Sequence, residues 1–423
     1  MFSENPAPKN KLSKIPDISN LLENGPRESK SSLSSFSGAP AKNNSFENVR
    51  AKVKDPRKSF TIISNFVRRE NIDPNITTKE LVSTDPTQQI DENINLLTQI
   101  ETTKNILCCK YTEDYNFISA GFPDGMVRLF AKNTGQLAMV LYDEESLANA
   151  ATVTCIKHRP VSKNYPSTNT LLCSYTNGCV KCWDFVSSRC IYTIRERRQT
   201  LSLSYHLRLP KFVTCGDDAK IFLYDEETKM QERVFIASDD QNICDGHTSR
   251  VFAACFNPRS QFEIVTGGWD NTVQFWDMRA PHATRHIAGV HICAEGIDIS
   301  PNGRTLLTAA WQKANPFQVW DYNNLKLIQN VKPDPYNAML YCGRWLDNNY
   351  AVCGGCEPNI IRLVDMRTYM NVGAVKNLPG GVYSLDIGIR RKNKKTRGQK
   401  ADVSSLPMLA YVSGKRIAQI DYC

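Results

Sequence analysis

The chain has 423 residues, 41% of them hydrophobic, and its 52 Lys and Arg outnumber 43 Asp and Glu to give a formal net charge of +9. This apolar content suffices for a globular core. Because no run of 18 apolar residues occurs and the first residues lack an apolar stretch, neither a membrane span nor a signal peptide is predicted. We therefore expect a soluble, intracellular chain whose 15 cysteines stay reduced.

The N-terminal segment, residues 1–90, mixes Ser, Asn, Pro and Lys with scattered apolar residues and shows no sustained periodicity. Such a composition predicts a disordered tail. Two short apolar clusters interrupt it, Ile15–Leu22 and Phe60–Arg69. Each is interpreted either as part of a solvated tail or as an amphipathic segment that folds on a partner.

From residue 91 to residue 423, short apolar runs alternate with turn residues, which predicts a domain made of β-sheets. The first run is Asn93–Glu101, in which Ile94, Leu96 and Ile100 lie on one side of an alternating strand. After it, units of three short runs follow one another to the end of the chain. The chain therefore contains an internal structural repeat.

The most regular unit is Gly246–Arg279, which opens with Gly-His and closes its third run with Trp-Asp. Turn residues at Asn257-Pro258 and Asp270-Asn271 separate its runs. This unit resembles a WD40 repeat, one blade of a β-propeller, and weaker copies fill most of the chain. The residue that closes each third run marks the copies: Phe130, Trp183, Tyr224, Trp276, Trp320, Val364 and Ile420. The prediction is a seven-bladed, all-β propeller over residues 91–423.

The seventh unit has no outermost strand of its own, because the chain stops two residues after Asp421. An unpaired strand edge there would promote aggregation. We expect Asn93–Glu101 to supply the missing strand and to close the ring.

The resemblance implies a hydrogen-bonded relay in the unit Gly246–Arg279, formed by His247, Thr266, Asp270 and Trp276. Buried polar atoms must be paired, and leaving one without a partner costs roughly 1–3 kcal/mol. His247 is therefore interpreted as a structural histidine. Units five and six have Ala314 and Pro358 in place of the turn aspartate, so their edges must be satisfied in another way.

No pattern typical of catalysis or cofactor binding is found: there is no nucleophile–base pair, phosphate loop or metal signature at credible spacing. Two Cys-x-x-Cys pairs, Cys179–Cys182 and Cys353–Cys356, lie in separate units and too far apart for a zinc ribbon. Three histidines after the fourth unit are interpreted as solvated loop residues: His282, His286 and His291. We expect no enzymatic activity, no cofactor and no metal.

In WD40 propellers, the connections between blades and the turns between the second and third strands form one face, where peptide partners usually dock. The family's contact positions correspond to Arg250, Phe252, Trp269, Glu295, Trp311, Tyr341 and Tyr383. Aromatic and arginine side chains are enriched at protein interfaces, so a partner site over blades 4 to 7 is predicted. The alternative is that Phe252, Tyr341 and Tyr383 only line the central channel while the tryptophans cover strand ends.

The opposite face carries two other candidates. Trp276-Asp277-Met278-Arg279 and Val364-Asp365-Met366-Arg367 resemble the W-D-x-R box by which some WD40 proteins dock to the cullin-4 ubiquitin-ligase adaptor. Arg279 and Arg367 are therefore candidate adaptor contacts.

A basic loop, Arg390–Lys400, lies between the first two strands of the seventh unit on the same face. Its cations are Arg390, Arg391, Lys392, Lys394, Lys395, Arg397 and Lys400. It is interpreted as a solvated loop, a nuclear-import signal, or a contact with nucleic acid or an anionic surface. No aromatic residue is interleaved with these cations, so base stacking is not supported.

These observations favour a non-catalytic scaffold that assembles a multiprotein complex through the faces of a propeller. Two alternatives stay open: a substrate receptor of a cullin-4 RING ubiquitin ligase, and a nuclear RNA- or chromatin-associated propeller that uses the basic loop. The expected partners are other proteins, without a small-molecule substrate and without membrane insertion. The expected location is the cytoplasm or the nucleus.

Overall fold

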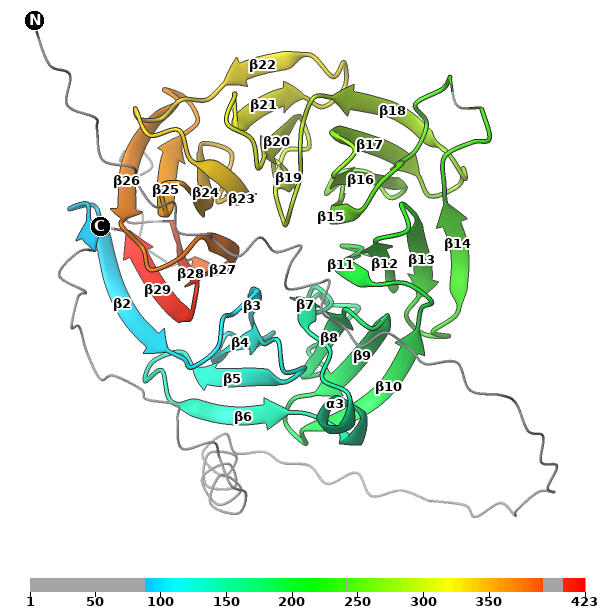
Figure 1. Cartoon of the computed structure of the whole chain (residues 1–423), viewed down its shortest axis with the longest axis horizontal. Coiled ribbons are helices and arrows are strands. Elements are labelled where there is room, and N and C mark those ends of the chain that lie inside the picture. Colours follow the sequence, from blue (N-terminus) through cyan, green and yellow to red (C-terminus); the bar gives the residue numbers. More distant parts are fainter. Residues whose placement is uncertain (1–87, 241, 391–405, 423) are drawn as a thin grey trace, which may run out of the picture. The chain divides into compact units, whose positions relative to one another are not determined.

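The computed structural model describes residues 88–240, 242–390 and 406–422. These residues form seven β-sheets arranged as blades around a common centre, which confirms the predicted seven-bladed propeller (Figure 1). Three sequence predictions lie outside the described residues: the disordered tail up to residue 87, its two apolar clusters, and the basic loop from residue 391 onward. Of that loop only the backbone of Arg390, the last residue of a strand, is described. The last residues of the predicted tail, Gln89 and Ile90, form a strand instead.

Within blades 1 to 4, four antiparallel strands follow one another from the centre of the ring to its rim (Figure 1). Blade 1 contains β3 (Cys108–Tyr111), β4 (Phe117–Gly121), β5 (Val127–Ala131) and β6 (Leu137–Leu141). Blade 2 contains β7 (Val153–Lys157), β8 (Thr170–Tyr175), β9 (Cys179–Asp184) and β10 (Arg189–Arg195). Blade 3 contains β11 (Thr200–Tyr205), β12 (Lys211–Gly216), β13 (Ile221–Asp225) and β14 (Gln231–Phe235). Blade 4 contains β15 (Val251–Phe256), β16 (Glu263–Gly268), β17 (Thr272–Asp277) and β18 (Ala283–Ala288).

Blades 5 to 7 repeat this plan, but the last two also recruit strands from the N-terminal side of the domain. Blade 5 contains β19 (Ile297–Ile299), β20 (Thr305–Ala309), β21 (Phe317–Asp321) and β22 (Leu327–Asn330). Blade 6 contains β23 (Met339–Trp345), β24 (Tyr350–Cys356), β25 (Ile360–Asp365) and β26 (Met370–Lys376), with β1 (Gln89–Ile90) beyond them. Blade 7 contains β27 (Val382–Arg390), β28 (Pro407–Ser413) and β29 (Arg416–Tyr422), with β2 (Ile94–Glu101) as its outer strand.

The hydrophobic core lies between neighbouring blades. Each sheet has one neighbouring sheet on either side in the ring, so both of its faces are covered. Val127 and Leu129 of β5, for example, share one buried cluster with Val153, Leu171 and Trp183 of blade 2. This arrangement explains why the strands are apolar on both faces and why so many cysteines fit among them. The one helix in the described ranges, α3 (Glu144–Ala148), lies between blades 1 and 2; no described helix is long and apolar enough to cross a membrane.

The N-terminal strand β2 closes the ring as predicted. It pairs antiparallel with β29, with Ile94 opposite Tyr422 and Glu101 opposite Arg416. In the other six blades, the pairing of the third strand with the fourth shifts register next to the residue that marks the repeat. In blade 7 the same shift occurs beside Ile420. Strand β2 thus reproduces the geometry of a fourth strand supplied by its own repeat.

Strand β1 is a feature that the sequence did not predict, because two residues show no periodicity. It extends blade 6, with Gln89 opposite Lys376 and Ile90 opposite Val375. The chain then continues along β26, where the Asp91 amide donates to the carbonyl of Ala374 at 3.0 Å. The described chain therefore first adds a strand to blade 6 and then supplies the outer strand of blade 7.

Candidate functional site

In blade 4, four side chains are joined by hydrogen bonds at the edge of the sheet. His247 Nδ1 lies 2.8 Å from Asp270 Oδ2, and Nε2 of the same ring lies 2.7 Å from Thr266 Oγ1. Trp276 Nε1 donates to the same Thr266 oxygen at 2.7 Å. Burial would raise the pKa of Asp270, but hydrogen bonds and the charge of His247 outweigh burial and lower it. With both ring nitrogens engaged, His247 is a structural residue.

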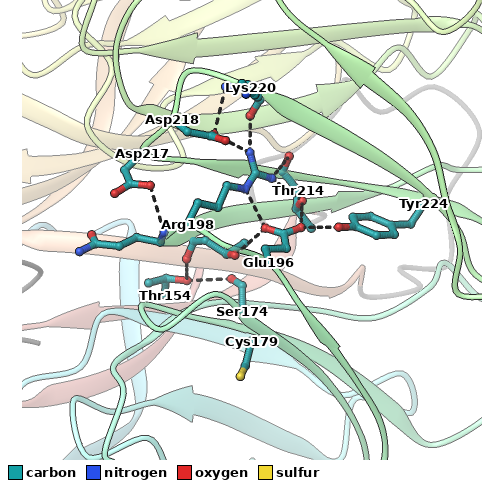
Figure 2. A network of polar contacts seen from close by, with 12 residues as sticks. Thr154, Ser174, Cys179, Glu196, Arg198, Thr214, Asp217, Asp218, Lys220 and Tyr224 are labelled. Atoms are coloured by element: carbon teal, nitrogen blue, oxygen red, sulfur yellow. Dashed lines mark hydrogen bonds and ion pairs between the residues drawn. The ribbon is translucent and has the colours of Figure 1, made fainter. Parts of the chain in front are cut away.

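Blade 3 builds an equivalent network without a histidine (Figure 2). Arg198 donates from Nη1 to Asp218 and from Nη2 to Thr214 Oγ1, at 2.8 and 2.7 Å. Its Nε donates to Glu196 at 2.8 Å, and Glu196 also accepts from the Tyr224 hydroxyl at 2.8 Å. Thr214, Asp218 and Tyr224 stand at the positions of the relay threonine, aspartate and tryptophan of blade 4. Arginine takes the place of the histidine.

The remaining edges use other polar pairs. In five blades a long polar side chain is buried two residues before the residue that marks the repeat: Arg128, Lys181, Gln274, Gln318 and Arg362. In blade 6, which lacks the turn aspartate, Arg362 Nε donates to Asp334 at 2.7 Å. In blade 5, Trp320 Nε1 donates to Thr308 Oγ1 at 3.1 Å. Arg362 and Trp320 thus have hydrogen-bond partners at the buried edges of their blades.

Aromatic rings from blades 4 to 7 form a continuous row, which we call the aromatic string. It consists of Phe252, Trp269, His291, Trp311, Tyr341 and Tyr383. Successive ring centroids are 5.3, 6.0, 6.2, 6.3 and 5.0 Å apart, within the range of favourable aromatic contacts. Five of the seven partner-site residues predicted from the sequence belong to this string.

The aromatic string contains both buried and partly exposed rings. Phe252, Tyr341 and Tyr383 lie near the starts of the innermost strands β15, β23 and β27 and are almost fully buried. Trp269 and Trp311 lie in the turns between the second and third strands of blades 4 and 5, and both are partly exposed. The tryptophans can therefore contact a partner, whereas the buried rings hold them in place.

His291, interpreted from the sequence as a solvated loop residue, is the sixth member of the string. It lies in the connection from blade 4 to blade 5, is partly exposed, and stacks on Trp269. Its Nδ1 lies 2.7 Å from Asn271 Oδ1, and its carbonyl accepts from the Trp311 amide at 2.8 Å. Asn271 has a φ of +60°, a conformation that asparagine tolerates in turns. His291 thus links the turns of both blades, whereas His282 and His286 contribute nothing to the string.

Arg250, the sixth predicted residue, lies beside the string. Its guanidinium is 5.3 Å from the centroid of a Trp269 ring, a cation–π geometry. The Arg250 carbonyl also accepts from the Trp269 amide at 2.9 Å. Gly268 makes this approach possible, because a Cβ there would lie 2.3 Å from the same carbonyl oxygen.

Glu295, the seventh predicted residue, differs from the expectation: it lies in the middle of the ring and pairs with cations from two other blades. Its carboxylate pairs with Lys157 of blade 2 and, at 2.8 Å, with Arg344 of blade 6. Arg344 also lies 3.7 Å from Asp298. Burial opposes the ionisation of Glu295, but the two cations outweigh it and hold the pKa of this carboxyl well below its usual value. Its charge is neutralised within the fold.

The opposite face presents Arg279 and Arg367 in matching conformations. Arg279 donates from Nε and Nη2 to Asp277 at 2.9 and 2.6 Å, and Arg367 makes the same pair of bonds to Asp365 at 2.9 and 2.7 Å. The two side chains are 67% and 52% exposed. Arg367 also donates to the Tyr350 hydroxyl at 2.9 Å. Each guanidinium is thus held in a fixed position that a partner can reach.

The cysteines of the two Cys-x-x-Cys pairs lack the surroundings of reactive thiols. In the two Cys-x-x-Cys pairs all four are free and buried. Burial raises the pKa of Cys182 to about 12 and that of Cys353 to about 11, so both stay protonated at neutral pH. Among the described residues, no three His, Cys, Asp or Glu side chains are grouped so that they could hold a metal ion.

Comparison with known families finds one match, to the model described as "WD domain, G-beta repeat", at residues 238–277. That range contains the relay histidine and the three inner strands of blade 4. It is the unit whose sequence is most regular and whose four-residue relay is complete. The other blades depart from the family pattern at these relay positions.

Relatives are similar to this chain over limited regions. A striatin homolog of Dictyostelium discoideum is 22% identical over 209 residues, 47% of this chain and 25% of that protein. A ribosome biogenesis protein WDR12 homolog of Culex quinquefasciatus is 28% identical over 115 residues, 27% of this chain and 26% of the relative. The DDB1- and CUL4-associated factor 13 of Xenopus laevis is 26% identical over 149 residues, 35% of this chain and 31% of the relative. The chain thus spans about a quarter to a third of these curated relatives.

Proposed function

We propose that this chain, a WD40-repeat β-propeller, is a non-catalytic scaffold that binds a protein partner through the aromatic string and thereby assembles a multiprotein complex. The observation that carries this proposal is the continuous row of rings over four blades, with Trp269, His291 and Trp311 partly exposed on one face. WD40 propellers are typically non-catalytic. Two of the similar proteins are named for ribosome biogenesis and for association with DDB1 and CUL4, which agrees with such a role.

The geometry of the string suits an interface with a peptide or a loop of another protein. Tryptophan and arginine are enriched among the residues that contribute most to binding free energy. Trp269 is held from three sides, by Phe252 below, His291 beside it and the Arg250 guanidinium against its ring. Because the Trp269 side chain is already held in place, it loses little conformational entropy when a partner covers it.

Affinity purification of the full chain followed by mass spectrometry tests the proposal. Truncation of a central tryptophan costs on the order of 2 kcal/mol of binding free energy, a loss of about 30-fold in affinity. We expect Trp269→Ala together with Trp311→Ala to remove the main partner from the purified sample, while the variant stays folded at the purification temperature despite a lower melting temperature. Phe262→Ala is the matched control, because it removes an exposed aromatic ring that contacts Arg279 on the opposite face. Unchanged capture by the folded double variant would contradict the proposal.

A second candidate function is that of a substrate receptor for a cullin-4 ubiquitin ligase. It is favoured by the matching, exposed conformations of Arg279 and Arg367, and one similar protein is named a DDB1- and CUL4-associated factor. Co-purification with the ligase adaptor should then occur and be lost in the Arg279→Ala, Arg367→Ala variant, with the partner on the aromatic string retained. Absence of the adaptor from the wild-type sample would exclude this role.

A further inference from the structure

The chain enters the described domain on the side of the aromatic string. Strand β26 ends at the connection from blade 6 to blade 7, and Gln89 pairs with its last residue, Lys376. Gln88 Oε1 accepts from Arg416 Nη1 at 3.3 Å, and Arg416 directly follows the turn between the second and third strands of blade 7. Both contacts belong to the face formed by blade connections and these turns. The segment that precedes Gln88 therefore joins the domain at that face.

An exposed aromatic ring lies between this entry point and the string. Lys376 Nζ is 5.7 Å from the centroid of the Tyr336 ring, which is 49% exposed. The next residue, Asn337, donates a hydrogen bond to the carbonyl of Lys313, in the same turn as Trp311. The surface therefore continues from the entry point over Tyr336 to the partly exposed ring of Trp311.

A suitable occupant precedes the entry point in the sequence. Phe60–Arg69, FTIISNFVRR, has five apolar residues in ten and ends in two arginines, which suit contact with aromatic rings. Only residues 70–87, 18 in all, separate it from Gln88. At up to 3.6 Å per residue they span at most about 65 Å. A compact domain of about 330 residues has a radius of gyration of roughly 20 Å, so the segment can reach any part of the string.

We propose that Phe60–Arg69 occupies the aromatic string of its own chain and competes there with the external partner. The inference rests on the proposed function, because it concerns the regulation of the same site. A segment tethered by a short linker has an effective concentration on the order of 1 mM. With an intermolecular Kd of about 100 μM, it fills the site about nine-tenths of the time. The apparent affinity for an external partner then falls by about tenfold.

The test uses a synthetic peptide of residues 58–70 titrated against three full-length chains. In the first variant, Phe60→Ser and Phe66→Ser remove the two rings of the tethered segment. The matched control, Leu21→Ser with Leu22→Ser, removes two apolar side chains from the other cluster. We expect the peptide to bind the first variant about tenfold more tightly than either the wild type or the control. This binding should disappear when Trp269→Ala is added to the first variant.

Equal peptide binding by the wild type and the first variant would overturn the proposal, as would the absence of binding to both. Binding that survives Trp269→Ala would also overturn it, because the segment would then bind elsewhere. Concentration-dependent dimerisation of the wild type that disappears in the first variant would assign the segment to a second copy and overturn occupancy within one chain. If partner capture depends on Trp269 but does not rise in the first variant, this inference fails while the proposed function stands. If the peptide binds as expected but Trp269→Ala leaves capture of the external partner unchanged, the proposed function fails instead.

Discussion

The substitution Glu295→Gln tests whether Glu295 stabilises the fold through an ion pair in the middle of the ring or contacts a partner at the surface. In the structure the Glu295 carboxylate neutralises Lys157 and Arg344, which belong to blades on different sides of the ring. The substitution keeps the shape of the side chain but leaves both cations without their shared carboxylate. Removing one partner of a buried ion pair typically costs 3–5 kcal/mol. Because Arg344 keeps Asp298 at 3.7 Å, we expect the lower end of that range, about 3 kcal/mol.

Thermal unfolding measures this loss. For a domain of this size, 1 kcal/mol corresponds to about 2 °C in melting temperature, so Glu295→Gln should melt about 6 °C lower at pH 7. Glu227→Gln is the matched control, because Glu227 is exposed and its substitution should leave the melting temperature unchanged. Partner capture by Glu295→Gln should equal that of the wild type at a temperature where both are folded.

The pH dependence gives a second test of the same interaction. The two cations hold the pKa of folded Glu295 below that of an unfolded glutamate, about 4.3. A depressed folded pKa contributes stability that is complete above the unfolded pKa and is lost as the pH falls through the folded value. The difference between wild type and Glu295→Gln should therefore be full at pH 7 and shrink below about pH 4. An unchanged melting temperature at pH 7 combined with lost partner capture would refute this reasoning and return Glu295 to the partner surface.

Two further predictions concern the ring itself. Ile94→Asp with Ile100→Asp places charges at buried positions of β2 and should lower the melting temperature by several degrees; an unchanged temperature would contradict closure by this strand. In blade 3, Arg198→Met leaves Glu196 buried without its cation and should cost about 3–5 kcal/mol, whereas adding Glu196→Gln should recover part of the loss. A double-mutant cycle in thermal unfolding measures this coupling, and strict additivity of the two losses would argue against the network.

The fold could be predicted from the sequence because each blade carries its own signals. The alternation of apolar residues, the turn residues and the large residue at the end of each third strand repeat along the chain, and they give the number of blades. Closure by Asn93–Glu101 followed from an unpaired edge that had to be covered. Strand β1 could not be found in this way, since its two residues show no periodicity and pair with a strand about 290 residues later in the chain, as in Gln89 with Lys376 (376 − 89 = 287).

The site could be predicted only in part, because ring contacts depend on how neighbouring blades are placed. Trp269 and Trp311 occupy equivalent positions of consecutive repeats and were found by that equivalence. His291 has no such signal; its place follows from hydrogen bonds to the turns of two blades. The position of Glu295 was likewise unpredictable, because its partner Lys157 is 138 residues earlier in the chain (295 − 157).

Hydrogen exchange of the purified chain, alone and bound to its captured partner, measures most directly where that partner sits. We expect slower amide exchange in the connection that contains His291 and in the turns that contain Trp269 and Trp311. Exchange in the turns of Arg279 and Arg367 should stay as in the free chain. Protection confined to those two turns, with unchanged exchange around Trp269 and Trp311, would contradict the assignment of the aromatic string as the partner surface.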